Sequence, residues 1–140
     1  MEYGIKSLMK TVATNGCFDI LHPGHIELLK YCKSLGTVVV GLNSDESVRR
    51  LKGPTRPFFS AEDRKAMLEG CRYVDRVEVF DEDTPYELIK QVGPDIIVKG
   101  GDYKKEDVVG NDLCEVKIFT YIEGFSTTSA LERYCNGLCV

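Results

Sequence analysis

The sequence contains no tryptophan, only two histidines and no long apolar run. The uninterrupted apolar stretches, such as Val38–Val40 and Ile96–Val98, are far shorter than the ~20 residues needed to span a bilayer. Residues 1–10 also lack the apolar core of a signal peptide. We therefore expect a cytoplasmic protein that neither crosses a membrane nor has a membrane as its partner.

The cysteine spacing gives no sign of a zinc site, and the charges give no sign of a nucleic-acid-binding protein. Six cysteines are present, but they show neither a C-x-x-C pair nor the spacing of zinc ligands, so they are interpreted as reduced, mostly buried thiols. A bridge or metal site using Cys135 and Cys139 stays an alternative. The net charge is −4, from 18 basic and 22 acidic residues, without a clustered basic face. Nucleic acid is therefore not an expected partner, and an anionic ligand must be held locally.

The chain has the size and composition of one compact domain, with 140 residues, 43% of them hydrophobic and 29% charged. We expect a single domain over residues 1–140, with its core in 11–131. Strand-like runs alternate with helix-like runs, which predicts a doubly wound α/β fold whose five parallel strands are joined by right-handed crossovers. The expected strands are 11–18, 37–42, 74–80, 95–99 and 115–122. The expected helices are 24–35, 60–70 and 84–93, with a last helix beginning near Ser126.

Turn residues predict where these helices begin and end. Gly36 is expected to cap the first helix in a left-handed conformation. Thr84 and Glu87 resemble a capping box, with Pro85 at the first helical position, and Gly93 is expected to end that helix. In a doubly wound sheet, ligands bind beyond the carboxyl ends of the strands, so functional residues are sought in the segments that follow each strand.

Both histidines, His22 and His25, lie directly after the first strand. Gly24 allows close backbone approach, and a helix beginning there directs free N–H groups and the positive end of its dipole at the same place. Two imidazoles at such a terminus can donate hydrogen bonds to phosphate oxygens and stabilise charge in a transition state. A zinc site, simple helix capping and an acid–base pair for other chemistry are the alternatives. Phosphate handling is the favoured interpretation.

A second group of phosphate-binding candidates lies near the carboxyl end of the chain. Gly124 frees a turn there, and the hydroxyls of Ser126, Thr127 and Thr128 would join the N–H groups of another helix terminus. An ordinary N-cap explains such a cluster as well. If this cluster binds phosphate, it and the phosphate site at His22 and His25 are expected to face one another.

Residues 16–25, GCFDILHPGH, resemble the G-x-F-D-x-x-H-x-G-H signature of the cytidylyltransferase-like nucleotidyltransferases. The turn at 123–129 resembles the second signature of that family. Between the two, the chain is similar to the family members that adenylylate D-glycero-D-manno-heptose 1-phosphate, and the resemblance covers about residues 11–131. The segments that carry it are 43–57, 62–64, 74–75, 80–85 and 98–103. Because many bacteria join this activity to a sugar kinase that is missing here, the chain resembles the stand-alone form.

The resemblance implies a Rossmann-like fold and a reaction between ATP and a sugar 1-phosphate. A phosphate oxygen of the sugar attacks the α-phosphorus of ATP, which releases pyrophosphate and gives an ADP-sugar; Mg²⁺ accompanies the triphosphate, and a homodimer is expected. One alternative is a cytidylyltransferase for glycerol 3-phosphate or a similar polyol phosphate. Those enzymes carry Arg-Thr-Glu-Gly before the second signature, where this chain has Tyr121–Gly124. The other alternative is a nucleotide-binding module without turnover.

The resemblance also implies roles for individual residues. Catalytic roles fall on His22, His25, Lys52, Ser126 and Thr127. Nucleotide-binding roles fall on Gly16, Cys17, Phe18, Asp19, Gly24, Lys99, Gly101, Asp102, Gly124 and Thr128. Contacts with the sugar phosphate fall on Asp45, Arg56 and Arg64, and no protein-held metal is expected.

Plainer roles stay open for several of these residues. Asp19 and Asp45 can act as caps, and Lys52 and Arg56 can belong to a solvated loop. Residues 100–102 can form a simple reverse turn. Arg64 lies in the first turn of a helix, where a cation gains nothing from the dipole, and this favours a ligand role. The acidic run 81–83 is attributed to compensation of a helix dipole rather than to a metal.

Overall fold

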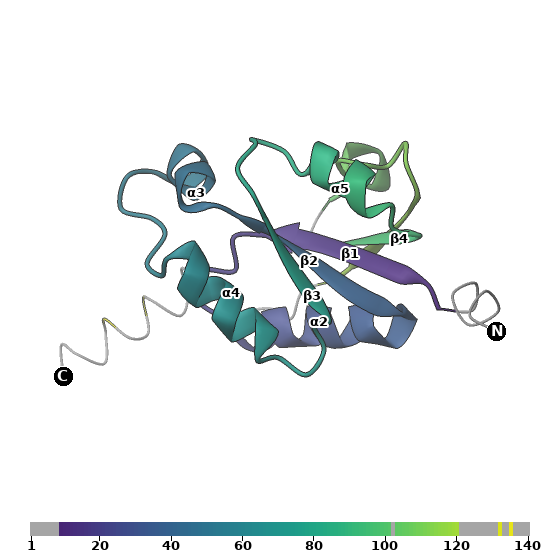
Figure 1. The fold of residues 1–140 in the computed structure, drawn as a ribbon, viewed down its shortest axis with the longest axis horizontal. Helices are drawn as coiled ribbons and strands as arrows, with labels where there is room; N and C mark the ends of the chain where they lie inside the picture. Colours follow the sequence, from purple (N-terminus) through teal and green to yellow (C-terminus); the bar gives the residue numbers. More distant parts are fainter. Residues whose placement is uncertain (1–8, 102, 121–131, 133–134, 136–140) are drawn as a thin grey trace.

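The computed structural model describes residues 9–101, 103–120, 132 and 135. In this part of the chain, a five-stranded parallel sheet has the order β3-β2-β1-β4-β5 (Figure 1). The strands are β1 (Thr11–Gly16), β2 (Thr37–Asn43), β3 (Arg76–Phe80), β4 (Ile96–Gly100) and β5 (Glu115–Phe119). The helices are α2 (Pro23–Leu35), α3 (Asp45–Lys52), α4 (Ala61–Glu69), α5 (Tyr86–Val92) and the short 3-10 helix η1 (Lys105–Asp107). The doubly wound α/β fold is thereby confirmed.

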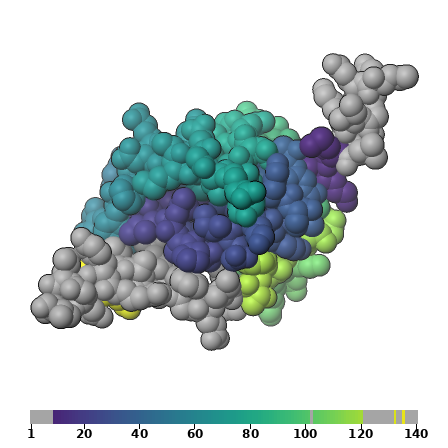
Figure 2. Space-filling view, turned by 90° about the horizontal axis from the view of Figure 1, so that it is seen from below, coloured from purple at the N-terminus to yellow at the C-terminus, as the bar shows by residue number. Residues whose placement is uncertain are grey.

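Helices cover both faces of the sheet, and each face has its own apolar cluster. On one face, α2 and α4 lie side by side (Figures 1 and 2), with Leu28 and Leu29 of α2 and Leu68 of α4 packed against the strands. On the other face, Ile89 of α5 packs with Ile97 and with residues next to η1 and in β5. The strand order reverses between β1 and β4, so their carboxyl ends form the switch point at which such sheets bind ligands.

The ends of two helices differ from the sequence predictions. Gly36 is extended, with φ 161° and ψ −153°, rather than left-handed. A Cβ there would lie 2.1 Å from the carbonyl oxygen of Lys10, so close backbone packing requires the glycine. The capping box predicted at Thr84 is wrong, because Pro85 is the N-cap of α5 and no side chain caps that helix. Gly93 is left-handed at φ 62° and ends α5 as predicted.

Helix α3 was not predicted from the sequence. Val48 is its only buried apolar residue, so the segment lacks the apolar periodicity that marks a helix. Polar interactions at its two ends stabilise the helix instead. Ser44 accepts the N–H of Ser47 at the start, and basic residues lie in the last turn, where they interact favourably with the helix dipole. Lys52 therefore ends a helix, and the loop that was expected to hold it begins only at Gly53. The predicted helix near Ser126 lies outside the described residues. No described helix has the length and apolar character to cross a bilayer.

Candidate active site

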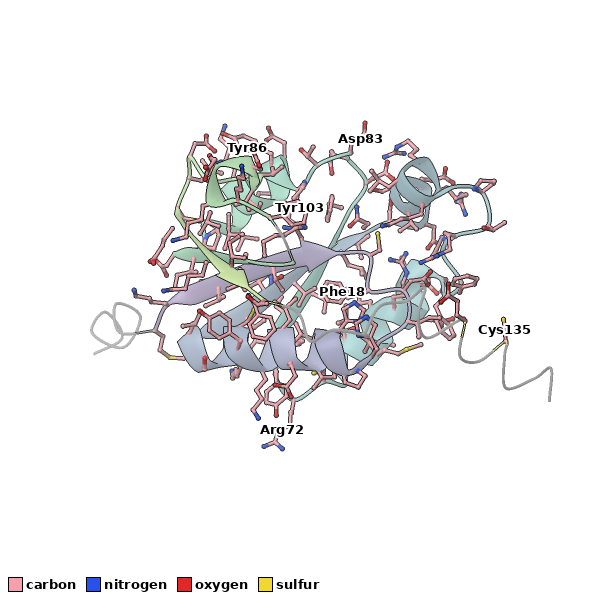
Figure 3. All side chains as sticks on the ribbon, turned by 180° about the vertical axis from the view of Figure 1, so that it is seen from behind. Phe18, Arg72, Asp83, Tyr86, Tyr103 and Cys135 are labelled. Carbon is pink, nitrogen blue, oxygen red and sulfur yellow. The ribbon has the colours of Figure 1, made fainter. Side chains whose placement is uncertain are left out.

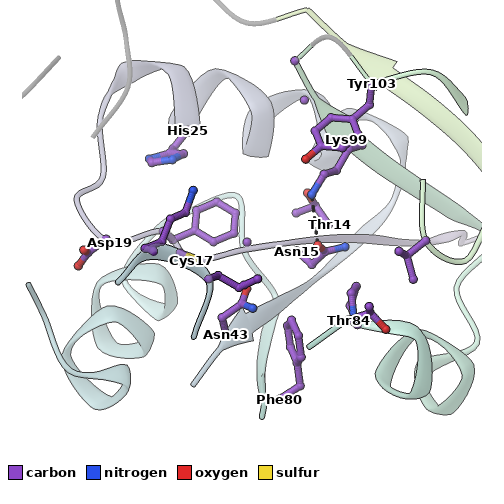
Figure 4. A pocket seen from close by; sticks show the side chains of 18 of the residues that line it. Thr14, Asn15, Cys17, Asp19, His25, Asn43, Phe80, Thr84, Lys99 and Tyr103 are labelled. Carbon is purple, nitrogen blue, oxygen red and sulfur yellow. Dashed lines mark hydrogen bonds between the residues drawn. The ribbon is translucent and has the colours of Figure 1, made fainter. Parts of the chain in front are cut away.

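A cavity of about 630 Å³ opens at the carboxyl ends of β1, β2 and β4 (Figure 4). Its wall comes from the β1–α2 turn, the start of α2, the end of α3, the β3–α5 loop and the segment after β4. Figure 3 shows Phe18 on the α2 side of the sheet, whereas Asp83 and Tyr103 lie on the side of α5. The cavity thus lies at the switch point where the fold predicts a ligand.

The β1–α2 turn holds the loop between α3 and α4 through a buried carboxylate. Phe18 adopts a positive φ of 45°, which turns the chain sharply after β1. Asp19 is 2% exposed and accepts the backbone N–H groups of Phe58 (2.9 Å) and Phe59 (3.1 Å). Its carboxylate also accepts Arg56 Nε at 3.2 Å. Asp19 borders the cavity, and its hydrogen bonds fix the loop that carries Arg56.

The two histidines occupy different positions. His22 is the buried N-cap of α2, and its ring stacks on that of His25 with 3.7 Å between centroids. Its backbone N–H donates to His25 Nδ1 at 3.4 Å. Of the two rings, that of His25 lines the cavity, so His22 lies behind the ring that a ligand would meet. The predicted direct contact of His22 with a triphosphate has no support in this arrangement.

His25 is neutral at physiological pH. Burial, reinforced by the neighbouring His22, lowers the pKa of His25 from 6.5 to about 4, against an opposing hydrogen bond with the backbone of Ile20. Because Nδ1 accepts the N–H of His22, we assign the ring proton to Nε2. The imidazole is therefore a neutral hydrogen-bonding group at the wall of the cavity.

Three cationic side chains line the same cavity: Lys52, Arg56 and Lys99. Lys52 forms no hydrogen bond or ion pair with another described residue, whereas Arg56 is held by Asp19 and by the ring of Phe58, 4.8 Å away. Lys99 Nζ lies 3.4 Å from Asn15 Oδ1 and 4.9 Å from the centre of the Tyr103 ring. Burial lowers the pKa of Lys99, and Lys52 adds to this effect against an opposing influence of Cys17. The cavity lining thus carries three cations against two carboxylates, Asp19 and Asp83, in a protein of net charge −4.

Arg64 and Asp45 do not line the cavity, and their contact with substrate stays a prediction. The Arg64 side chain is 0% exposed. Its guanidinium donates to the carbonyl oxygens of Phe59 (2.9 Å), Cys17 (2.8 Å) and Asn43 (2.8 Å) and to Asp45 Oδ1 (2.8 Å). Asp45 also accepts the N–H of Ala61 at 2.8 Å. The pair joins the β1–α2 turn, the end of β2 and the starts of α3 and α4, so the geometry favours a positioning role.

The remaining predicted residues divide between those at the cavity and those elsewhere. Gly16, Cys17, Phe18 and Gly101 line it, and burial raises the pKa of the Cys17 thiol despite nearby cations. Gly24 is buried in the first turn of α2 and is not part of the lining. Five predicted residues lie outside the described part of the chain: Asp102, Gly124, Ser126, Thr127 and Thr128.

Two residues of the acidic run 81–83 contact α3 and its N-cap, and the predicted compensation of the following helix dipole stays a prediction. Asp81 accepts the hydroxyl of Ser44 at 2.6 Å, and Asp83 accepts Arg50 Nε at 2.9 Å. Among the described residues, no group of three or more histidine, cysteine or acidic side chains could hold a metal ion.

Sequence reasoning missed several lining residues, namely Asn15, Asn43, Phe80, Thr84 and Tyr103. Asn15, Asn43 and Phe80 lie near or at the carboxyl ends of their strands. That position was the available signal, because the carboxyl ends of parallel strands meet at one edge of the sheet. None of the five belongs to the two signatures, although Asn43, Phe80, Thr84 and Tyr103 lie in the intervening segments that carry the family resemblance.

Comparisons with known proteins show the family of the chain and agree with its fold. The family model described as cytidylyltransferase-like matches residues 13–130. A relative from Wolinella succinogenes, named bifunctional protein HldE, is 56% identical over 126 residues, which are 89% of this chain and 27% of that protein. The chain therefore spans about a quarter of the length of such relatives. A solved lipopolysaccharide core biosynthesis protein from Thermoplasma volcanium is 32% identical, with a TM-score of 0.68 over 81% of this chain and 97% of that one.

Proposed function

The chain belongs to the cytidylyltransferase-like family of nucleotidyltransferases, and from this premise we propose that it is an adenylyltransferase for a sugar 1-phosphate. The substrates would be ATP and D-glycero-D-manno-heptose 1-phosphate, and the products an ADP-sugar and pyrophosphate. The observation that carries the proposal is the cavity itself, in which the start of α2, a neutral His25 and three cations converge at the switch point. We place the reaction in the cytoplasm, which fits the free thiols of the described cysteines.

The proposed reaction needs no protein nucleophile. A phosphate oxygen of the sugar forms a bond to the α-phosphorus of ATP, while the bond from that phosphorus to the leaving pyrophosphate breaks. The phosphate is ionised near neutral pH, so catalysis consists of alignment and of neutralising charge. His25 Nε2–H and the first N–H groups of α2 would contact the triphosphate. His22 would orient the His25 ring, and Lys52 and Arg56 would neutralise the developing negative charge.

Mg²⁺ belongs to the substrate in this proposal, because it would arrive bound to the triphosphate. The carboxylate of Asp19, which borders the cavity, is already occupied by N–H donors. Asp83 likewise accepts from Arg50. Mg²⁺ commonly keeps several waters and few protein ligands in such complexes, so the sparse donor set fits a nucleotide-borne ion. The expected homodimer stays a prediction, which the molecular mass in solution tests.

The decisive experiment measures pyrophosphate release with ATP, CTP, GTP or UTP, each combined with heptose 1-phosphate or glycerol 3-phosphate. We expect the highest kcat/KM for ATP with the heptose phosphate. His25→Ala should lower kcat by roughly 10²–10³-fold, as for the loss of a preorganised donor to a transition-state oxygen. Lys30→Ala is the control, because Lys30 lies on the exposed side of α2. A preference for CTP with glycerol 3-phosphate, or full activity of the His25 variant, would contradict the proposal.

A further inference from the structure

The cavity has two chemically different walls. One carries His25, Lys52 and Arg56, which suit a polyphosphate. The opposite wall, here called the amide wall, consists of Asn15, Asn43, Phe80 and Thr84, with Lys99 at its border (Figure 4). Building on the adenylyltransferase function, we propose that the amide wall binds the sugar phosphate, with Lys99 and Asn15 on its phosphate and Asn43 and Thr84 on its hydroxyls.

The strand register explains why the two amides share a wall. Asn15 of β1 pairs with Gly41 of β2, and Asn43 lies two residues further along β2. Because side chains two apart in a strand point to the same face, both amides project on the side of α5. A Cβ at Gly41 would lie 3.3 Å from the Cβ of Asn15 and 3.0 Å from Leu88 Cδ2. The glycine therefore leaves the room that Asn15 occupies.

Asn43 is held in one orientation by the protein. Its Nδ2 donates to Ser47 Oγ at 2.9 Å, and this hydroxyl donates in turn to the carbonyl oxygen of Glu82 at 3.4 Å. Because the Ser47 hydroxyl donates onward, the amide atom of Asn43 that faces it is the nitrogen. No described residue donates to the other amide atom, Asn43 Oδ1. Asn43 lines the cavity, so its Oδ1 can accept a hydrogen bond from a ligand there. A hydroxyl of the ligand would supply the missing donor.

Lys99, at the border of the amide wall, has hydrogen-bond donors that no described residue uses. An ammonium group carries three N–H donors, and among the described residues Lys99 has one long hydrogen bond, to Asn15, and one ring contact, to Tyr103. Lys52 lies close enough to disfavour the charged form of Lys99. Two ammonium groups lining one cavity are best stabilised by an anion between them. A phosphate at Lys99 would also face the triphosphate across the cavity, as transfer between two phosphates requires.

Phe80 and Thr84 complete a surface that suits a sugar. The buried Phe80 presents apolar ring surface to the cavity, where the C–H groups of a sugar can pack. The exposed Thr84 offers a hydroxyl that both donates and accepts. A wall of two amides, a hydroxyl and one ring therefore matches a polyhydroxylated ligand.

The test separates the KM for the sugar phosphate from the KM for ATP. In the full chain, Asn43→Ala and Thr84→Val should each raise the KM for heptose 1-phosphate by about 10-fold, as for the loss of one hydrogen bond of roughly 1.4 kcal/mol. The KM for ATP should stay within about twofold of the wild-type value. Asn111→Ala is the matched control, because Asn111 bonds only to backbone carbonyls near η1, away from the cavity.

The possible failures are distinguishable. Absence of turnover by the wild-type chain with every sugar phosphate would overturn the adenylyltransferase function. Turnover by the wild type together with an increased KM for ATP in the Thr84 and Asn43 variants would overturn the amide-wall proposal alone. The same holds if both KM values stay unchanged. Thr84 is exposed, so its variant keeps the test decisive even if Asn43→Ala fails to fold.

Discussion

Two cations near the cavity, Arg64 and Lys99, differ in how many protein groups they contact. On the α3–α4 flank, the guanidinium of Arg64 is completely buried and donates to protein oxygens from several segments. On the β4 flank, Lys99 has only a 3.4 Å hydrogen bond and a ring contact with described residues. The hydrogen bonds of Arg64 are completed by the protein itself, and they hold together segments that border the cavity. Lys99 has spare donors, and such donors are what a ligand can use.

The largest expected change in the free energy of unfolding is that of Arg64→Met, which removes the hydrogen bonds of the buried guanidinium. Removal of the guanidinium leaves buried carbonyls and Asp45 without their donor, so the free energy of unfolding should fall by roughly 3–5 kcal/mol. Arg64→Lys should recover only part of this loss, since an ammonium cannot reproduce the planar set of donors. Urea unfolding followed by circular dichroism measures both values.

The matched control for Arg64 is Arg49→Met on the surface of α3. Arg49 pairs with Glu46 in an exposed salt bridge, and such pairs contribute about 0–1 kcal/mol. Equal losses in the Arg49 and Arg64 variants would mean that the buried network does not fix this flank. In that case, the contrast between the two flanks would be wrong.

His25 tests whether burial controls charge at the cavity without an anionic partner. Its pKa is lowered from 6.5 to about 4, so between these values the unfolded chain binds a proton that the folded chain does not. The free energy of unfolding should therefore fall as the pH drops from 6.5 to 4, by roughly 3 kcal/mol in total, and this contribution should level off below pH 4. The difference in unfolding free energy between wild type and His25→Gln across this range isolates the effect, because the acidic residues titrate in both. A pH-independent difference would contradict the lowered pKa.

The contrast between the flanks also explains which parts could be predicted from the sequence. The sheet followed from apolar runs at β1, β2 and β4, because buried strands need continuous apolar residues. The place of His25 at the site could be predicted from its position directly after the first strand. Arg64 was assigned to the substrate because its helical position looked unfavourable, whereas its partners come from segments far apart in the chain. Such long-range hydrogen bonds leave no local pattern, and α3 was missed because it depends on caps and charges rather than on apolar periodicity.

The smallest expected change in stability, and the sharpest contrast with Arg64, belongs to Lys99→Met. Methionine keeps the apolar part of the side chain and removes an ammonium group that has few partners, so the free energy of unfolding should stay within about 1 kcal/mol of wild type. Turnover with ATP and heptose 1-phosphate should nevertheless fall by roughly 10–100-fold, because a hydrogen bond to a charged group is worth about 1.5–3 kcal/mol.

Lys33→Met provides the comparison for Lys99, because Lys33 is far from the cavity and already has a protein partner. Its Nζ donates to Asp75 at 2.8 Å, and both side chains are partly exposed. We expect a small loss of stability and unchanged turnover, which is the reverse of the result for Lys99. If Lys99→Met instead destabilised the chain as Arg64→Met does, Lys99 would be structural, and the contrast between Lys99 and Arg64 would be wrong.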